Sequence, residues 1–451
     1  MLLRDCLNYL FREYERLGVQ YCILRNYEKL PEENIGADID MLIERKAFKM
    51  NYEIILKMAT HYNFHYINVI KRQYMTRYFL FKFKDNNIFS LALDFHQDEE
   101  WKGAIYLCGE EILSGERQFK NFYIPSPTQE AFISWLSPLL SGGLIKDKYR
   151  YAILSNAQKG METFSKLCIN AFGEKLTQQL TPFFESGKLD ETVKFRKKII
   201  FSLYLNNVKK RTIKFLSNLA LFYLHEIKLR LFATRYFLSI IGPDGTGKTT
   251  IINALTDLFV DVFKTKHSNI CVFHFRPLLL PNLKKLFSLG RHKGIEEDFT
   301  KPHRAKPSGV ILSIFRLLYY FIDYTIGYLI KVKPLFARNK IVIFDRYYYD
   351  FIVDPARARI KLPKIIPITL MKLLPMPAIV IFLDNKAEII YKRKQELPIE
   401  EISRQLVEYN NLTYKYSCFY KVDSSKAVSE IAKEIACEFV KRITSPLNIT
   451  Q

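Results

Sequence analysis

The chain has 451 residues, a length that usually corresponds to two or three domains and excludes a single small module. Apolar residues make up 49% of the chain and charged residues 25%, a composition that supports folded cores and excludes a disordered protein. Lys and Arg number 68 against 46 Asp and Glu, and the net charge of +22 indicates anionic partners such as phosphates, nucleic acid or an acidic lipid surface.

The first 18 residues carry Arg and Glu throughout, so no secretory signal is expected. The seven cysteines are scattered and form no C-x-x-C pair, which favours reduced thiols in a cytoplasmic protein. The most apolar segment, 309–330, contains Arg316 and Asp323, and we expect it to be a buried helix of a soluble domain. For a second apolar stretch, 215–224, two interpretations stay open: a basic amphipathic helix on anionic lipid, or a helix packed inside a domain.

The first half of the chain changes its pattern near residue 128. Short or alternating apolar segments before that point predict strands. They lie at 19–44, 77–83 and 88–95. Long helical periodicities rich in Leu, Phe and Lys follow. We therefore expect an α+β domain over 1–127 and a basic helical subdomain over 128–235, whose charged helices bind RNA or lipid or are simply solvated faces.

The second half, 236–451, alternates short apolar runs with helical stretches, as expected for a parallel sheet covered by helices on both faces. The runs lie at 236–241, 270–275, 340–345, 377–384 and 418–423. We expect a doubly wound α/β domain with its ligand crevice at the carboxyl ends of the strands.

Residues 242–249, GPDGTGKT, fit the phosphate-loop pattern G-x-x-x-x-G-K-[ST] without a mismatch. The motif stands between a predicted strand and a helix expected to begin near Lys248. Glycines let backbone amides wrap around phosphate oxygens, Lys248 would contact the β- and γ-phosphates, and Thr249 would bind Mg²⁺. The alternative is a glycine-rich turn that only closes a strand–helix unit. The expected ATP-binding residues are Gly242, Gly245, Thr246, Gly247, Lys248, Thr249 and Thr250.

The run IVIFD places Asp345 at the end of a predicted strand, where a carboxylate holds Mg²⁺ in many nucleotide-binding proteins. Arg346 follows at once and would clamp an acceptor phosphate bidentately. The alternative is a surface Asp–Arg pair. Asp384 ends the next apolar run in the same way, and there we favour a helix cap over a functional role.

These segments together resemble the thymidylate kinase branch of nucleoside monophosphate kinases over roughly residues 236–445. The resemblance is carried, in the same order and spacing, by GPDGTGKTT, DRYYYD and FLDNKAEIIYKRK. It implies that Asp244 lies near the acceptor, that Asp345 serves magnesium, and that Arg346 binds the acceptor phosphate. Arg276 is similar to a second acceptor-binding arginine of that family. A lid over 391–398 would supply Arg393 or Lys394 to the transferred phosphoryl group.

The chain also departs from this family. Arg276 directly precedes Pro277 with no Glu between them, the lid is short, and a basic insert between Leu278 and Ser308 has no counterpart in the small kinases. The identity of the acceptor therefore stays open.

Asp38 and Asp40 are two residues apart on a predicted strand, so they share one face, and Asp94 ends another strand. Three such carboxylates can hold two Mg²⁺ ions for attack on a nucleotide phosphate. The region 5–150 resembles nucleotidyltransferases of the polymerase-β type, but Leu24, Arg25 and Asn26 stand where that family has a Gly-Ser pair. Arg25 would then contact phosphate, or the domain binds a nucleotide without catalysing a reaction on it. The alternative is two surface aspartates beside a turn.

The leading hypothesis is an ATP- and Mg²⁺-dependent phosphotransferase of the thymidylate kinase-like type, fused to a nucleotidyltransferase-like domain. Bacterial proteins associated with surface-polysaccharide synthesis are similar in architecture, so an anionic acceptor and a peripheral position at the inner membrane face are further expectations. The second hypothesis is a non-catalytic nucleotide-binding regulator of a membrane-associated glycan-assembly complex. Nucleic-acid end processing ranks last, since no specific nucleic-acid module is recognisable.

Overall fold

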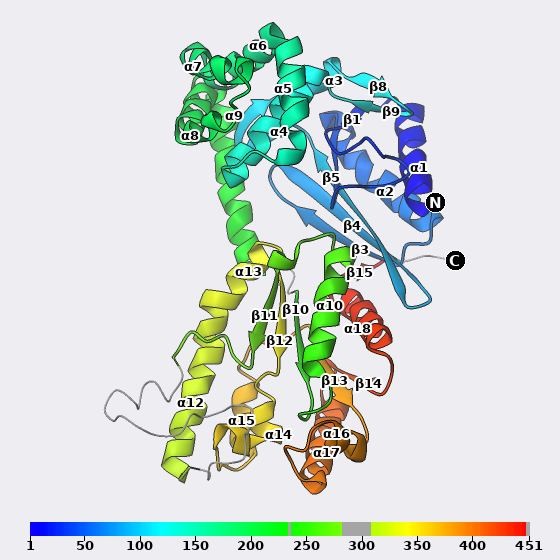
Figure 1. Cartoon of the computed structure of the whole chain (residues 1–451), viewed down its shortest axis with the longest axis vertical. Helices are drawn as coiled ribbons and strands as arrows, with labels where there is room; N and C mark the ends of the chain where they lie inside the picture. The colour runs from blue at the N-terminus through cyan, green and yellow to red at the C-terminus, as the bar shows by residue number, and fades with distance from the viewer. Residues whose placement is uncertain (233–235, 282–307, 448–451) are drawn as a thin grey trace. The chain divides into compact units, whose positions relative to one another are not determined.

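The computed structural model describes residues 1–232, 236–281 and 308–447 (Figure 1). The chain divides into two compact units, each with its own hydrophobic core. Unit 1 comprises 1–82, 90–227 and 446–451, and unit 2 comprises 83–89 and 228–445. The basic insert singled out in the sequence lies largely outside the described residues.

Unit 1 is built on a sheet with the strand order β1-β2-β5-β4-β3-β15. Its strands are β1 (Tyr21–Ile23), β2 (Ile39–Ile43), β3 (Tyr66–Lys71), β4 (Met75–Lys84), β5 (Asn87–His96) and β15 (Ser445–Pro446). β2 and β5 run parallel, with Asp40 opposite Asp94, while the pairs β1–β2 and β3–β4 are antiparallel. Two hairpins complete the strands: β6 (Glu99–Trp101) with β7 (Ala104–Leu107), and β8 (Arg117–Phe119) with β9 (Phe122–Ile124).

Helices form the rest of unit 1, including the stretch where the sequence predicted helical periodicity. They are α1 (Leu2–Arg16), α2 (Phe48–His61), α3 (Gly109–Ser114), α4 (Pro127–Gly142), α5 (Arg150–Lys159), α6 (Met161–Phe172), α7 (Glu174–Glu185), α8 (Glu191–Lys194) and α9 (Arg196–Phe232). α4 begins with a capping box between Ser126 and Gln129 and ends at Gly143 in the left-handed conformation.

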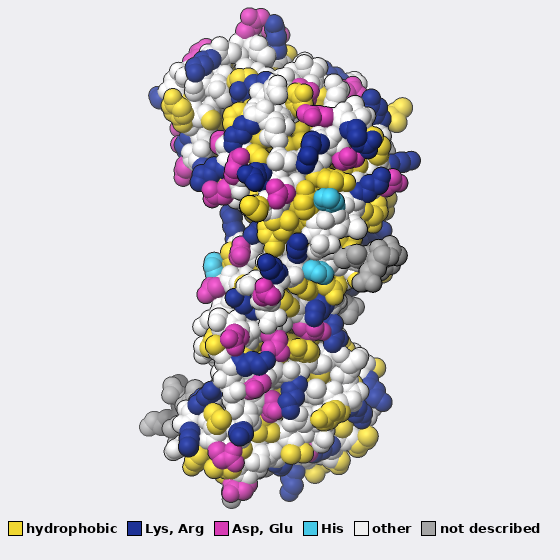
Figure 2. Space-filling model, turned by 90° about the vertical axis from the view of Figure 1, so that its right-hand side faces the viewer, with side chains coloured by type: hydrophobic (Ala, Val, Ile, Leu, Met, Phe, Trp, Pro, Cys, Tyr) yellow, Lys and Arg dark blue, Asp and Glu magenta, His cyan; other side chains and the backbone are white. Residues whose placement is uncertain are grey.

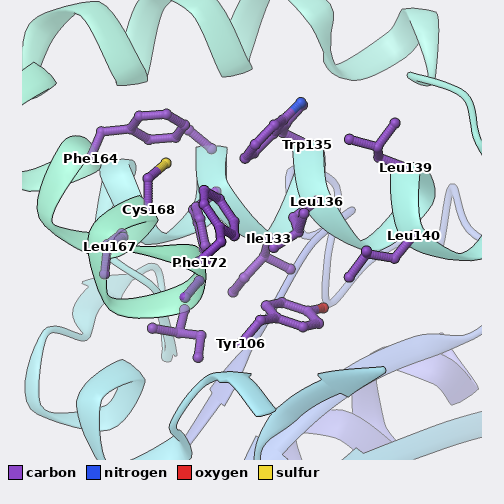
Figure 3. Close-up of a cluster of buried hydrophobic side chains, with 14 of the residues drawn as sticks. Tyr106, Ile133, Trp135, Leu136, Leu139, Leu140, Phe164, Leu167, Cys168 and Phe172 are labelled. Carbon is purple, nitrogen blue, oxygen red and sulfur yellow. The ribbon is translucent and has the colours of Figure 1, made fainter. Parts of the chain in front are cut away.

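The core of the helical part centres on Trp135 of α4, which packs among Phe164 and Phe172 of α6 and Phe184 of α7 (Figure 3). The indole Nε1 of Trp135 donates to Thr192 Oγ1 at 3.0 Å, so the one polar atom of this buried ring is satisfied. The aromatic cluster thus fixes α4, α6 and α7 against one another.

α9 is interrupted at Arg211, whose backbone is non-helical. The apolar stretch 215–224 follows the interruption, and among its large apolar side chains Phe215 alone is buried. Leu219 and Phe222 are partly buried, and Leu216, Leu221, Tyr223 and Leu224 are exposed. Both interpretations of this stretch therefore stay open.

Unit 2 contains a five-stranded parallel sheet with the order β11-β12-β10-β13-β14. The strands are β10 (Phe237–Ile241), β11 (Ile270–His274), β12 (Ile341–Asp345), β13 (Ile379–Asp384) and β14 (Phe419–Asp423). Each lies within a predicted apolar run, because a parallel strand covered on both faces needs apolar side chains at nearly every position. The carboxyl ends of β10 and β12 are neighbours, with Ile240 opposite Asp345.

The longer helices of unit 2 are α10 (Lys248–Val262), α12 (Val310–Gly327), α17 (Ile399–Lys415) and α18 (Val428–Ile443). Shorter helical segments are η3 (His267–Asn269), η5 (Tyr328–Val332), α13 (Lys333–Ala337), α14 (Asp350–Val353), η6 (Pro355–Ala358), α15 (Ile365–Met371) and α16 (Ala387–Arg393). α10 starts at Lys248, the residue where the sequence predicted a helix to begin.

α12 corrects one expectation. The segment 309–330 was expected to be a buried helix, but one side of it is exposed and entirely apolar. The continuous helix Val310–Ala337 is long and apolar enough to cross a membrane, by length and composition only. Composition alone does not reveal which face of an apolar helix is covered.

Basic and acidic side chains are interspersed over the face of the molecule drawn in Figure 2. The positive net charge is therefore not gathered into one continuous patch on that face.

Candidate functional site

The loop 242–247 joins the end of β10 to the start of α10 (Figure 1). Gly245 and Gly247 have φ angles of 92° and 90°, which residues with a Cβ rarely adopt. A Cβ on Gly245 would also lie 3.0 Å from the carbonyl oxygen of Ile390. Within the described residues, the amides of Gly245, Gly247 and Lys248 donate to no protein group. These amides stand at the N-terminus of a helix, where an anion is favoured.

The ammonium group of Lys248 folds back over this loop. Its Nζ donates to the carbonyl oxygens of Gly242 at 2.9 Å and Pro243 at 2.7 Å. Burial, together with the positive charge of Arg346, lowers the pKa of Lys248 to about 7. Asp244 Oδ1 lies 3.7 Å from the same nitrogen. Two carbonyls and one more distant carboxylate replace the hydration of the cation only in part, so an anion that enters the loop would be a further partner.

Asp244 brings two arginines together beside Lys248. Arg346 Nη2 donates to Asp244 Oδ1 at 2.5 Å, and Arg357, in η6, donates to Asp244 Oδ2. Burial opposes ionisation of Asp244, but Arg346, Lys248 and Arg357 outweigh it and hold its pKa well below the usual range. One carboxylate therefore holds two guanidinium groups in a buried site.

Arg346 is fixed from several directions. Its Nη1 donates to Asp350 Oδ2 at 2.6 Å, and Asp350 in turn accepts from the Tyr409 hydroxyl at 3.0 Å. The backbone of Arg346 has a φ of 71°, an uncommon value for a residue with a side chain, and strain of this kind is often found at functional sites. The guanidinium is thus held in position before any ligand binds.

Asp345 lies at the end of β12. Its Oδ2 is 3.1 Å from His274 Nδ1, whereas its Oδ1 is buried and has no hydrogen-bond partner in the described part of the chain. Thr249, the residue after Lys248, is exposed. Mg²⁺ in phosphoryl-transfer sites is bound by one or two protein oxygens together with substrate phosphates. The unsatisfied carboxylate oxygen and the exposed hydroxyl therefore fit the predicted magnesium site.

Arg276 and Arg393 are not joined to the Asp244 cluster by any hydrogen bond described here. Arg276 is buried; its Nη1 donates to Asp323 Oδ2 at 2.7 Å and its guanidinium lies 5.7 Å from the centre of the Tyr320 ring. Arg393 is the last residue of α16 and is exposed, while Lys394 pairs with Glu396 at 3.0 Å. The predicted roles of both arginines stay predictions.

In unit 1, Asp38, Asp40 and Asp94 come together, and two arginines form ion pairs with them. Arg77 contacts Asp94 through two bonds of 2.6 Å and Asp38 through one of 2.5 Å. Arg25 Nε donates to Asp40 Oδ2 at 2.7 Å, so Arg25 lies at the cluster, as a carboxylate partner. Burial and the neighbouring carboxylates raise the pKa of Asp38 to about 6.

The described residues contain no group of three or more His, Cys, Asp or Glu placed to hold a metal ion. In this arrangement the partners of the three aspartates are the side chains of Arg25 and Arg77. Metal binding by Asp38, Asp40 and Asp94 stays a prediction from the sequence.

Sequence reasoning missed Arg357, His274 and Arg77. Arg357 lies 11 positions after Arg346 in the segment DPARAR, and its pairing with Asp244 depends on the turn made by η6. Arg77 lies on β4, 17 positions before Asp94, and the pairing of the strands brings the two together. The signal in the sequence is weak: Arg77 is the one charged residue in the segment MTRYFLF.

A solved thymidylate kinase from Ehrlichia chaffeensis is similar to the chain with a TM-score of 0.32 and 16% identity, over 46% of this chain and 98% of that one. No protein-family model and no curated protein matches the sequence. The chain has a mixed α/β fold that contains a parallel sheet.

Proposed function

We propose that unit 2 is an ATP- and Mg²⁺-dependent phosphotransferase of the nucleoside monophosphate kinase type. The observation that carries the proposal is the set of unpaired amides at Gly245, Gly247 and Lys248 at a helix N-terminus, in the same loop whose carbonyls accept from the Lys248 ammonium group. An amide-lined loop beside a buried cation favours the binding of an anion, and in this proposal the anion is the polyphosphate of a nucleotide.

The residues of the site have separable roles in this proposal. The loop amides and Lys248 bind the β- and γ-phosphates, and Lys248 leaves its carbonyl partners to do so. Arg346 and Arg357, held by Asp244, bind the acceptor phosphate and align it with the γ-phosphate. Thr249 and Asp345 would hold Mg²⁺, which neutralises charge on the phosphates when bound. Positioning and charge stabilisation supply the rate enhancement.

The test is ADP release from ATP by the purified full chain, with a panel of nucleoside monophosphates and sugar phosphates as acceptors. Lys248→Ala should abolish an activity seen with any acceptor. Lys264→Ala is the matched control, because Lys264 lies just after the same helix and forms a partly exposed pair with Asp261. Equal activity of the two variants would contradict the role of the loop.

The non-catalytic alternative is favoured by the arginine-filled carboxylate cluster of unit 1. A regulator of this kind would bind ATP, measured by titration calorimetry, yet release no ADP with any acceptor in the panel.

A further inference from the structure

α12 has two unlike sides. Its inner side is packed into unit 2, where Asp323 is fully buried and accepts from Arg276 and from the amides of Leu279 and Leu280. Tyr324 is fully buried as well and packs against Tyr347 and Tyr348. These contacts fix the rotation of the helix about its axis.

The outer side, here called the α12 apolar face, carries only aliphatic and aromatic side chains. Every exposed residue between Val310 and Ile330 is Val, Ile, Leu or Phe. The face consists of Val310, Ile311, Leu312, Ile314, Phe315, Leu318, Ile322, Ile326, Leu329 and Ile330. Spacings of three and four residues keep them in one stripe along a helix about 27 Å long. Ile311 is 86% exposed.

Exposure of an apolar surface of this size to water is energetically unfavourable. Soluble proteins rarely expose contiguous apolar patches of this extent, and large ones mark interaction sites with proteins or membranes. Because its inner side carries the buried Asp323 and the tyrosine contacts, α12 belongs to the fold of unit 2, and a position in the plane of a bilayer surface suits it better than a position across the bilayer.

Two candidate occupants of the α12 apolar face differ in their charge: a second copy of the chain and a lipid surface. Each copy carries a net charge of +22, so two copies repel one another, whereas an anionic leaflet attracts either one. Four basic residues lie within ten positions after the apolar face, at Lys331, Lys333, Arg338 and Lys340. The ammonium groups of Lys331 and Lys340 also donate to the carbonyl oxygens of Leu278 and Ser268. Cations beside an apolar stripe are the combination that anionic bilayers bind.

We propose that the α12 apolar face binds the surface of an anionic phospholipid bilayer, with its aliphatic side chains at the acyl boundary. This inference goes beyond the proposed function, because a kinase site does not require a lipid surface. It also does not depend on catalysis, so vesicle binding and ADP release can fail separately.

The experiment is sedimentation of the full chain with vesicles of phosphatidylcholine, with and without phosphatidylglycerol. We expect binding to the anionic vesicles that weakens as salt rises. The double variant Ile311→Glu, Ile322→Glu should bind at least about tenfold more weakly, because each isoleucine buries several carbon groups at the interface. The matched control is Ile365→Glu, since Ile365 is an exposed isoleucine of α15 in the same unit.

The variants are compared by circular dichroism, and both substitutions are at exposed positions, so folding should be retained. Absence of vesicle binding by the unmodified chain would overturn the proposal. Equal loss in Ile365→Glu, or no loss in the double variant, would also overturn it. A dimer detected by light scattering that the double variant disrupts, without vesicle binding, would assign the face to a second copy instead.

Discussion

Replacing Asp244 by Ala tests whether one carboxylate holds the acceptor side of the site together. Arg346 has a side-chain exposure of 4% and Arg357 of 12%. The substitution leaves each of these poorly hydrated guanidinium groups with one carboxylate, Asp350 for Arg346 and Asp354 for Arg357. Removal of one partner from a buried ion pair costs about 3–5 kcal/mol. For a unit of this size the expected drop in melting temperature is about 6–20 °C.

The substitution should also create a binding site for an anion. Inorganic phosphate can take the place of the carboxylate between Arg346 and Arg357, because guanidinium groups bind phosphate bidentately. Phosphate should therefore raise the melting temperature of Asp244→Ala more than that of the unmodified chain.

The stability difference has a defined pH dependence. Because the folded-state pKa of Asp244 is held well below the usual value, its contribution to stability is present above the unfolded pKa of about 3.9 and is lost as the pH falls below it. The two proteins should differ at pH 7 and converge in acid.

Differential scanning fluorimetry with and without phosphate is the assay, and Asp261→Ala is the control because Asp261 is 75% exposed in its pair with Lys264. The reasoning is refuted if Asp244→Ala melts like Asp261→Ala, or if phosphate stabilises every variant equally.

Three further predictions concern buried contacts. Asp323→Asn should destabilise unit 2 by about 3–5 kcal/mol, since it removes the negative charge from the buried ion pair with Arg276; urea unfolding followed by circular dichroism measures this, and a loss below 1 kcal/mol would contradict it. Trp135→Ala should cost about 3–5 kcal/mol through the cavity and the lost bond to Thr192, while Trp101→Phe, at a partly exposed site, should cost much less in the same assay. Arg77→Met should destabilise unit 1 at pH 8 and less at pH 5, where Asp38, with a pKa of about 6, takes up a proton; an equal loss at both values would argue against the ion pairs.

The sequence predicted the strands of unit 2 well because parallel strands buried on both faces are continuous apolar runs. β10 and β12 were located to within a residue, and α10 begins at the predicted Lys248. The loop was predictable too, since its glycines and its lysine are consecutive. β3 was not predicted, because YINVIK mixes polar and apolar residues without clear alternation.

The sequence did not predict which acidic and basic side chains form ion pairs with one another. Arg357 and Arg77 reach their aspartates only through turns and strand pairing, over separations of 113 residues from Asp244 and 39 from Asp38. The solvent exposure of one side of α12 was also not predictable from the sequence, because an apolar helix has the same composition whether a protein core or a bilayer covers it.

The arginines at the aspartate cluster of unit 1 have one more consequence. Arg25 and Arg77 are covalent parts of the chain, so the ion pairs that they form with Asp38, Asp40 and Asp94 in this arrangement need no dissolved divalent ion. Unit 1 should accordingly keep its fold through exhaustive dialysis against a chelator, because the ion pairs at the aspartates are made within the chain.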